Sequence, residues 1–358
     1  MLKTRLRLFA IILAILLLPA KAFAEVEHEL LLFLSAEGAN KLLEANEDIK
    51  SPDGVLSADI LYGFSWEQFH FLGEYLASNK ETELERLQLG LEFGENNFAW
   101  IGRFHVPSNF WMTAYHHGQY LQTSISKPGI AEFEDFGGII PSHTTGLLLD
   151  GTHVFDDSTG ITTAFSIGTA PALDDGFMEN FDLLNPQSGH NLAYHFRFTY
   201  QPNYFDNNKI GLVASFADLN AEHSTIQGQE IDAVEQITVG GFVDWYWQEW
   251  RLVSAVSHII NRLYRNNRIN DDAFTVGFVQ TEYELNQNWI FFGRVEESFS
   301  TGNSDYLKLI PNFVESRQMI GARFEFLQRH ALTLELAHIE TVKENFGQAR
   351  LQWSAIFP

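Results

Sequence analysis

Hydrophobic and polar residues alternate with a period of two along most of the chain. In the stretch 192–201 every even-numbered residue is Leu, Tyr or Phe, whereas the odd-numbered positions include His195, Arg197 and Gln201. The stretch 320–326 repeats the pattern, with Arg323 between Ala322 and Phe324. This period is that of a β-strand with two different faces. No long amphipathic helix and no shift in composition marks a second domain, so we predict a single all-β domain.

The alternation, divided at the clusters of turn-forming residues, predicts sixteen strands. An even number is the rule for bacterial single-chain barrels. The expected strands are 26–34, 55–65, 67–78, 84–94, 97–106, 143–150, 161–169, 190–201, 209–217, 236–247, 249–262, 273–286, 288–298, 316–327, 330–342 and 349–357.

The strand lengths and the aromatic residues favour a transmembrane antiparallel β-barrel over a soluble sandwich. Many of the strands run to ten or more residues, which is longer than the usual strand of a soluble protein. Their apolar faces carry Trp or Tyr near one end, as at Trp245, Trp289 and Trp353. Aromatic girdles of this kind lie at the two interfaces of a membrane. The opposite faces carry Arg, Glu, Asp and Gln, as expected of a wet lumen.

The lengths of the connections agree with this topology. Most odd-numbered strands lead into long connections and most even-numbered strands into short turns, so we place the long loops outside and both termini in the periplasm. Residues 79–83 are short for an outer loop and residues 151–160 are long for an inner turn. The long connections are 35–54, 107–142, 170–189, 218–235, 263–272 and 299–315.

The first 24 residues differ from all that follow. A basic start with Arg5 and Arg7 leads into an apolar run, and Ala22 and Ala24 then form an A-x-A cleavage site. This is the pattern of a secretory signal peptide. The apolar run is about 13 residues long, short of the ~20 that a spanning helix needs. We therefore expect cleavage after Ala24 and a barrel formed by residues 25–358.

Charge and composition exclude several classes of protein. The signal peptide holds four basic and no acidic residues, which leaves 19 Lys and Arg against 46 Asp and Glu in the remainder. Nucleic acid is excluded as a partner because phosphate binding needs a basic face. The chain has no Cys, so disulfides and thiol chemistry are excluded.

The end of the chain carries a resemblance to a known family. Leu351, Trp353, Ala355 and Phe357 form an alternating, aromatic-ended last strand, although Pro358 follows the Phe. With the predicted barrel, this resembles a Gram-negative outer-membrane porin, a general or solute-selective barrel of sixteen strands. The resemblance implies an outer-membrane location and recognition of the last strand by the barrel-assembly machinery. It also implies contact with lipid and lipopolysaccharide, a homotrimer as one candidate assembly, and no cofactor.

In sixteen-stranded porins the third outer loop folds into the lumen, and here that loop is 107–142, the longest connection of the chain. It offers Glu132, Glu134 and Asp135, together with His116 and His117, to a constriction. Carboxylates facing wall guanidiniums set up a transverse field across a water-filled passage. Alternatively, each arginine pairs with a neighbouring wall carboxylate such as Glu296 or Glu325. The alternation assigns these wall residues to the lumen: Arg86, Arg103, His105, Arg197, Arg294, Arg323 and Arg350.

Metal binding is the weaker interpretation of the histidines, and we expect no metal. Adjacent side chains such as His116 and His117 point in opposite directions on an extended backbone. A zinc site would need a further ligand, such as His105, His143 or Asp135, brought in by folding.

Enzyme activity is also the weaker interpretation. An outer-membrane lipid or ester hydrolase needs a Ser beside a His on the outer wall. Ser254, Ser257 and His258 supply the residue types without a motif that fixes them.

The sequence thus predicts an outer-membrane channel for passive diffusion of small hydrophilic solutes or ions. The acidic composition suggests a modest preference for cations. The alternatives are a non-conducting barrel that acts as a binding or structural component of a transport system, and the hydrolase.

Overall fold

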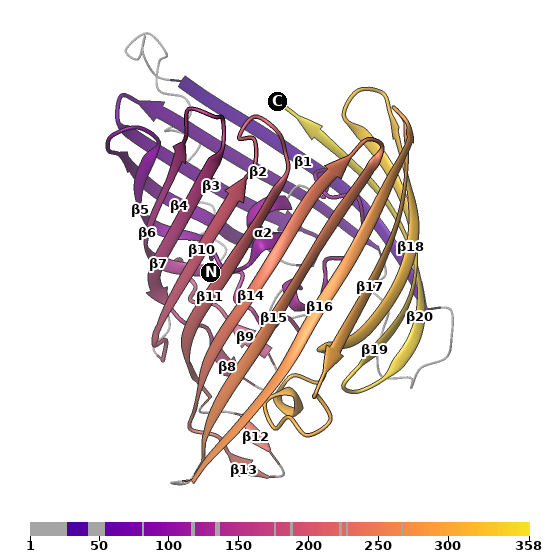
Figure 1. Cartoon of the computed structure of the whole chain (residues 1–358). Coiled ribbons are helices and arrows are strands. Elements are labelled where there is room, and N and C mark those ends of the chain that lie inside the picture. The colour runs from indigo at the N-terminus through magenta and orange to yellow at the C-terminus, as the bar shows by residue number, and fades with distance from the viewer. Residues whose placement is uncertain are drawn as a thin grey trace.

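A computed structural model shows a closed antiparallel barrel of sixteen strands (Figure 1). Each predicted strand has its counterpart, so the predicted fold class is confirmed. The structure describes residues 27–41, 54–80, 82–115, 119–132, 137–174, 177–186, 189–221, 224–226, 228–265 and 268–358. The predicted signal peptide lies outside these residues. The barrel strands are β1 (Glu27–Lys41), β2 (Val55–Trp66), β3 (Phe69–Ser78), β4 (Thr82–Glu92), β5 (Asn97–His105), β6 (His143–Val154), β7 (Gly160–Thr169), β10 (Leu192–Gln201), β11 (Lys209–Asn220), β14 (Ala233–Trp247), β15 (Trp250–Arg265), β16 (Arg268–Asn286), β17 (Trp289–Phe299), β18 (Val314–Phe326), β19 (His330–Thr341) and β20 (Asn345–Phe357).

The barrel closes where the first strand meets the last. β1 pairs with β2 on one side and with β20 on the other, and Leu32 lies opposite Phe357. Every other barrel strand is also paired on both sides. Closure leaves the sixteen described barrel strands without an open edge, which is what allows strands to cross hydrocarbon.

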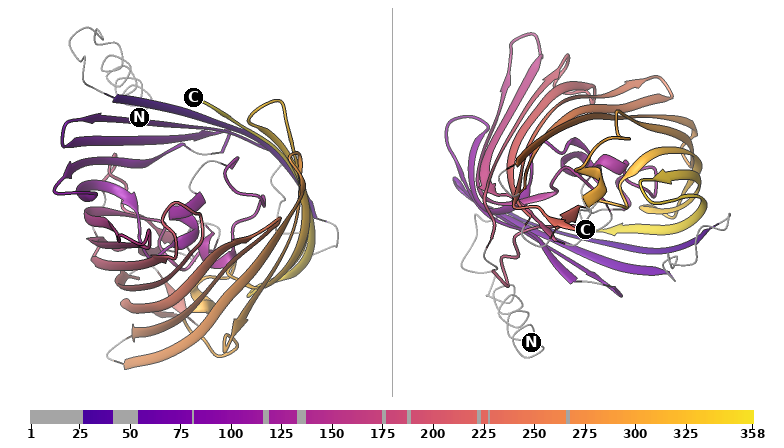
Figure 2. Two further views of the ribbon diagram at one scale, coloured as in Figure 1. Left: turned by 45° about the horizontal axis from the view of Figure 1, so that its top comes forward. Right: turned by 90° about the horizontal axis from the view of Figure 1, so that it is seen from below.

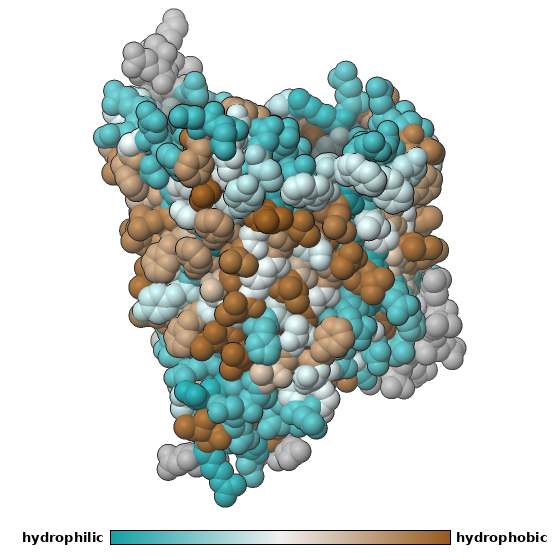
Figure 3. All heavy atoms as spheres, viewed as in Figure 1, coloured by the Kyte–Doolittle hydropathy of each residue, from teal (hydrophilic) through white to brown (hydrophobic). Residues whose placement is uncertain are grey.

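The side chains of the barrel are arranged inside out relative to a soluble protein. On β19, Leu332, Leu334 and Leu336 are 40%, 48% and 42% exposed, whereas the intervening Thr333 and Glu335 are buried. On the face drawn in Figure 3, apolar residues form a belt across the middle of the molecule, with polar residues above and below it. Such an exposed apolar belt matches the lipid-facing band of a membrane barrel.

One predicted loop is wrong. Residues 263–272 were expected to connect two strands, but β15 runs to Arg265 and β16 begins at Arg268. Arg262 pairs with Asp271 on the neighbouring strand, with 3.1 Å between Nε and Oδ1. The charged and Asn-rich composition resembled a loop, whereas these side chains pair across strands that extend beyond the membrane belt.

Other boundaries differ in the same direction, toward longer strands. β1 runs to Lys41 rather than residue 34, because it remains paired with β20 as far as Gln348. β6 and β7 extend into the predicted connection 151–160 and leave a turn at 155–159, so no inner turn is unusually long. The short connection after β3 is confirmed.

The connections contain further short elements. Between β5 and β6 lie α2 (Phe110–Tyr115) and the 3-10 turn η2 (Gly129–Ala131). The other long connections carry β8 (Ala172–Asp174), β9 (Phe177–Glu179), β12 (Thr225–Ile226), β13 (Gln229–Glu230) and η4 (Leu307–Leu309). Among the residues described, no helix is long and apolar enough to cross a membrane.

A hydrophobic cluster fills one side of the barrel interior. Inward residues of β15 and β16, such as Val253 and Phe278, are buried there with Trp111 of α2. The Trp111 and Phe278 ring centroids are 5.6 Å apart, and Phe110 stacks on Phe242 at 4.1 Å. The predicted wet lumen is therefore wrong on this side. Apolar residues occupy both parities of β15 and β16, so the sequence did not distinguish the two faces there.

Candidate channel interior

The connection between β5 and β6 is bound to the barrel wall along most of its described length. Residues 106–115 and 119–132 lie inside the ring of strands (Figure 2). Their hydrogen bonds reach β10 through Ser108 and His195, β16 through Thr123 and Glu282, and β19 through Glu335. We call residues 119–132 the tethered segment.

Arg294 of β17 is the centre of the tether. Its side chain is fully buried, with 2.8 Å between its Nε and Glu296 Oε1. The same guanidinium donates to the carbonyl oxygens of Ser126 and Lys127, both at 2.9 Å. It also lies 5.7 Å from the ring centroid of Trp111. One arginine thus satisfies a wall carboxylate and two backbone acceptors of the segment.

Three neighbouring arginines act in the same way. Arg323 of β18 donates to the carbonyls of Tyr120 and Gln122, both at 2.8 Å, and pairs with Glu325. Arg350 of β20 donates to Gln348 Oε1 at 3.0 Å and to Ser126 Oγ at 3.3 Å. Arg317, which the sequence analysis did not select, donates to the Lys127 carbonyl at 2.6 Å and pairs with Glu132 at 3.0 Å.

Wall carboxylates bind the N–H groups of the tethered segment. Glu335 accepts the backbone N–H groups of Ile125 and Ser126 at 3.0 and 3.1 Å, and also the Ser126 hydroxyl. Glu296 accepts the N–H of Gly129 at 2.6 Å. Charged acceptors and donors of the wall thus pair with backbone groups of the segment from Tyr120 to Gly129.

The predicted loop carboxylates and histidines are only partly placed. Glu132 is bound to Arg317, as described above. Glu134, Asp135, His116 and His117 lie outside the described residues. Arg294 and Arg323 pair with Glu296 and Glu325, the neighbouring wall carboxylates weighed as alternative partners.

Tyr115, the last residue of α2, lies against β14 and β15. Its hydroxyl donates to Asp244 Oδ2 at 3.2 Å and accepts from Arg251, which also binds Asp244 at 2.9 Å. Burial raises the pKa of Tyr115 well above its ordinary value, while Arg251 acts in the opposite direction. The phenol therefore stays neutral and can donate this hydrogen bond across the usual pH range.

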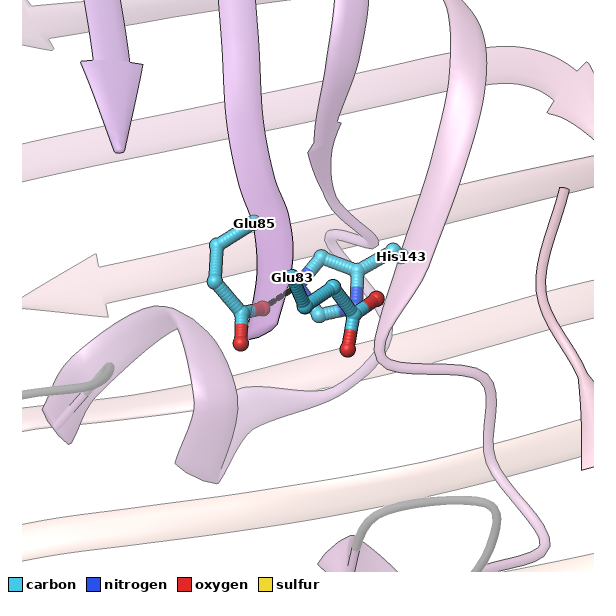
Figure 4. A group of neighbouring side chains, drawn as sticks. All are labelled: Glu83, Glu85 and His143. Carbon is cyan, nitrogen blue, oxygen red and sulfur yellow. Dashed lines mark ion pairs between the residues drawn. The ribbon is translucent and has the colours of Figure 1, made fainter. Parts of the chain in front are cut away.

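A second group of charged side chains joins β4 and β6 (Figure 4). Glu83 and Glu85 come from β4 and His143 from the first residue of β6, and their ligand-type atoms lie within 4.8 Å of one another. His143 Nε2 is 2.8 Å from Glu85 Oε2, and both side chains are almost completely buried. The His105 ring centroid lies 4.5 Å from that of His143. Folding thus brings together two histidines that are far apart in sequence.

The charges of this group are balanced by the protein itself. Arg103 pairs with Glu83, and it donates to the Glu85 carbonyl at 3.2 Å and the Phe181 carbonyl at 2.7 Å. His143 binds Glu85. Oxygen and imidazole donors are also metal-ligand types, but a guanidinium beside Glu83 competes with a cation for that carboxylate. The group is therefore explained as an ion-pair network without a metal ion. It links β4, β5 and β6 to one another and to Phe181 in the connection between β7 and β10.

Alternation alone could not assign Glu85 to the interior. The register of β3 and β4 shifts between Glu74 and Tyr75, so that Glu74 faces Arg86 and Tyr75 faces Leu84. Glu85 is the extra residue of this bulge, which allows both it and Arg86 to avoid the lipid face. Beyond a bulge, the odd and even positions of a strand exchange faces, and the sequence gives no clear signal of this. Arg317, in contrast, shares its parity with Arg323 and could have been selected.

Two adjoining cavities lie between residues 107–114 and the wall formed mainly by β4 to β11, with Phe242 of β14 beside the second. Their volumes are about 160 and 190 Å³. Thr113 and Arg197 line both, so the cavities meet at this pair, and the Arg197 guanidinium donates to the Thr113 hydroxyl. Arg86 and Asp150 line the first cavity and Lys209 the second. Both cavities are large enough to hold several waters.

The residues considered for hydrolysis have other hydrogen-bond partners. Ser254 donates to the Phe278 carbonyl at 2.6 Å, and His258 Nδ1 lies 2.9 Å from Thr275 Oγ1. Ser254 and His258 are four residues apart on an extended strand, or about 13 Å. Ser257 faces the interior, whereas His258 faces outward. The barrel does not assemble these residues into a serine–histidine pair.

The aromatic-ended motif of the last strand, with Leu351, Trp353 and Phe357, lies on the outer face of β20. Leu351 and Phe357 are 50% and 37% exposed, and Trp353 is partly exposed opposite Ala36 of β1. The His330 ring lies tilted beside Trp353 and edge-on to Phe357, at centroid distances of 5.8 and 5.7 Å. The lipid-facing aromatics of the closing seam therefore form one group.

Comparison with solved structures identifies the fold as that of outer-membrane porins. The anion-selective porin from Comamonas acidovorans matches over 93% of this chain and all of its own length, with a TM-score of 0.63 and 10% identity. The outer-membrane channel DcaP of Acinetobacter baumannii matches over 95% and 99%, with a TM-score of 0.58 and 14% identity. Salmonella typhi OmpF matches over 92% and 97%, with a TM-score of 0.57 and 12% identity.

The chain therefore has a porin-like barrel, and the fold is what these distant similarities establish. No protein-family model and no curated protein matches the sequence.

Proposed function

We propose that this protein is an outer-membrane channel through which small hydrophilic solutes diffuse passively. The observation that carries the proposal is the pair of adjoining cavities beside the β4–β11 wall, inside a barrel whose outer surface is apolar. Their lining includes Arg86, Asp150, Arg197 and Lys209, which hold water and polar solutes and disfavour apolar ones.

The passage in this proposal is displaced to one side of the barrel. The tethered segment lies along β16–β20 and the hydrophobic cluster extends over β10–β16, while residues 107–114 leave the two cavities beside β4–β11. The arginines of β17, β18 and β20 then have a structural role, since they hold the inserted loop. Arg86, Arg197 and Lys209 contact the solute.

Planar-bilayer recordings of the purified protein test the proposal. Stepwise single-channel conductance is expected in concentrated KCl. A protein that inserts and remains electrically silent, while it migrates as a folded, heat-modifiable barrel, excludes the channel and supports the second candidate. That candidate is a non-conducting barrel with a binding or structural role, and the packing of the hydrophobic cluster is the observation that favours it.

The outer-membrane location and the assembly belong to the same proposal. The similar structures are outer-membrane proteins, and one of them is described in a trimer form. We propose export by cleavage after Ala24, insertion by the barrel-assembly machinery through Leu351, Trp353 and Phe357, and contact with lipopolysaccharide. A homotrimer is the assembly to test, by light scattering in detergent with the detergent mass subtracted.

A further inference from the structure

We infer that the passage selects small anions and that Arg197 is its principal selectivity residue; this inference rests on the proposed channel function. Among the described residues that line the two cavities, the cations are Arg86, Arg197 and Lys209, and the anion is Asp150. The side chains that line the cavities therefore carry more positive than negative charge, although the whole chain is strongly acidic. A passage responds to the charges that line it more than to charges screened by water at the surface.

The partners of the three cations determine how much positive charge each one presents to a solute. Arg86 lies 2.7 Å from Glu74, which neutralises much of its charge. Lys209 is 3.7 Å from Asp244, but Asp244 is already bound closely by Arg251. Arg197 donates to the neutral Thr113 hydroxyl and also interacts electrostatically with the Asp150 carboxylate. The Asp150 carboxylate accepts the Trp100 indole N–H at 3.0 Å, which draws one of its oxygens toward the wall.

Arg197 also has the most favourable position of the three. It lines both cavities, so a solute that moves from one to the other passes its guanidinium. A guanidinium donates in a planar fork that fits the oxygens of carboxylates and phosphates. Thr162, Thr199 and Gln201 supply further hydrogen-bonding groups to the second cavity. The chemistry and the size suit small carboxylates and inorganic phosphate.

The hydroxyl of Thr113 keeps Arg197 in this position. Thr113 lies on α2, and its N–H donates to the Asn109 carbonyl at 3.1 Å. The loop therefore contributes the orientation of the selectivity residue as well as the inner wall of the passage. Opposite unit charges about 4 Å apart in water attract with an energy that corresponds to about a fivefold change in occupancy.

The test is the reversal potential of the purified full-length protein in planar bilayers under a KCl gradient. The wild type is expected to favour chloride over potassium by at least about threefold. Arg197→Gln removes the charge and is expected to bring the ratio close to one, whereas Arg197→Lys retains most of the selectivity. Arg262→Gln is the matched control, because Arg262 is an exposed arginine on the outward face of β15.

Inorganic phosphate gives a second measurement on the same proteins. Millimolar phosphate is expected to reduce the chloride current of the wild type and of Arg262→Gln, and to have a weaker effect on Arg197→Gln. Each variant is first checked for heat-modifiable migration, so that a misfolded barrel is recognised.

The outcomes separate the two proposals. A silent wild-type protein overturns both the channel and its selectivity. A conducting wild type that favours potassium, or is unselective, overturns the anion inference and leaves the channel standing. Selectivity that Arg197→Gln leaves unchanged overturns the role of Arg197.

Discussion

Glu335 on β19 accepts the backbone N–H of Ser126 at 3.1 Å, although 209 residues separate them in the sequence. The same carboxylate binds the N–H of Ile125 and the hydroxyl of Ser126. Arg294 holds the carbonyl of that serine at 2.9 Å. The Glu335 carboxylate and the Arg294 guanidinium thus both hydrogen-bond to Ser126, and they fix the loop to the barrel wall.

The hydrogen bonds of Glu335 to Ile125 and Ser126 predict that Glu335→Gln lowers the stability of the barrel. The amide group replaces one acceptor oxygen with a donor that faces other donors, so at least one buried N–H or hydroxyl loses its partner. The expected loss is about 1–3 kcal/mol in the free energy of unfolding, measured by urea denaturation in lipid vesicles. Glu297→Gln, at an exposed position of β17, is the control and should change stability by less than about 0.5 kcal/mol. Equal stability of the two variants would show that these hydrogen bonds are not energetically significant.

The Glu85–His143 pair predicts a coupled effect on stability. Glu85→Ala leaves a buried imidazole without its carboxylate and is expected to cost about 1–3 kcal/mol. The double change Glu85→Leu with His143→Leu removes both polar partners and should cost less than the sum of the single leucine changes. Urea denaturation of the three leucine variants completes this cycle. Additive costs would mean that the 2.8 Å contact contributes no coupling energy.

The sequence predicted the barrel because lipid and water select opposite faces of each strand. Leu334 and Glu335 show this clearly, since one is half exposed and the other is buried. The odd or even position of a residue along a strand predicts whether its side chain faces lipid or the interior. It predicts neither the height of the side chain in the barrel nor its partner, so the hydrogen bonds between Glu335 and Ser126 could not be predicted. Glu85 was missed because of a bulge. The inner face of β15 was missed because Val253 and Leu252 are both apolar.

The closing seam predicts a defect in assembly for Phe357→Ala. Phe357 is exposed on the outer face of β20 and lies opposite Leu32 where the barrel closes. If the assembly machinery recognises this aromatic end, the variant accumulates less folded barrel in the outer membrane. Phe291→Ala removes a similarly exposed Phe from β17, away from the seam, and serves as the control. The heat-modifiable fraction in isolated outer membranes is the measurement, and equal losses in both variants would remove any special role of the last strand.

The two faces of β7 provide the sharpest test of where solutes pass. Thr162 faces the interior and lines the cavity of about 190 Å³, whereas its neighbour Thr163 is exposed on the outer face. Thr162→Trp places an indole in the proposed passage and is expected to reduce single-channel conductance by more than half. Thr163→Trp places the same ring in the lipid-facing belt, where aromatic residues are favoured, and should leave conductance unchanged. Because the residues are adjacent, both variants perturb the same strand pairing with β6 and β10. An unchanged conductance in a folded Thr162→Trp protein would mean that solutes cross elsewhere, on the side of the barrel that the tethered segment and the hydrophobic cluster fill.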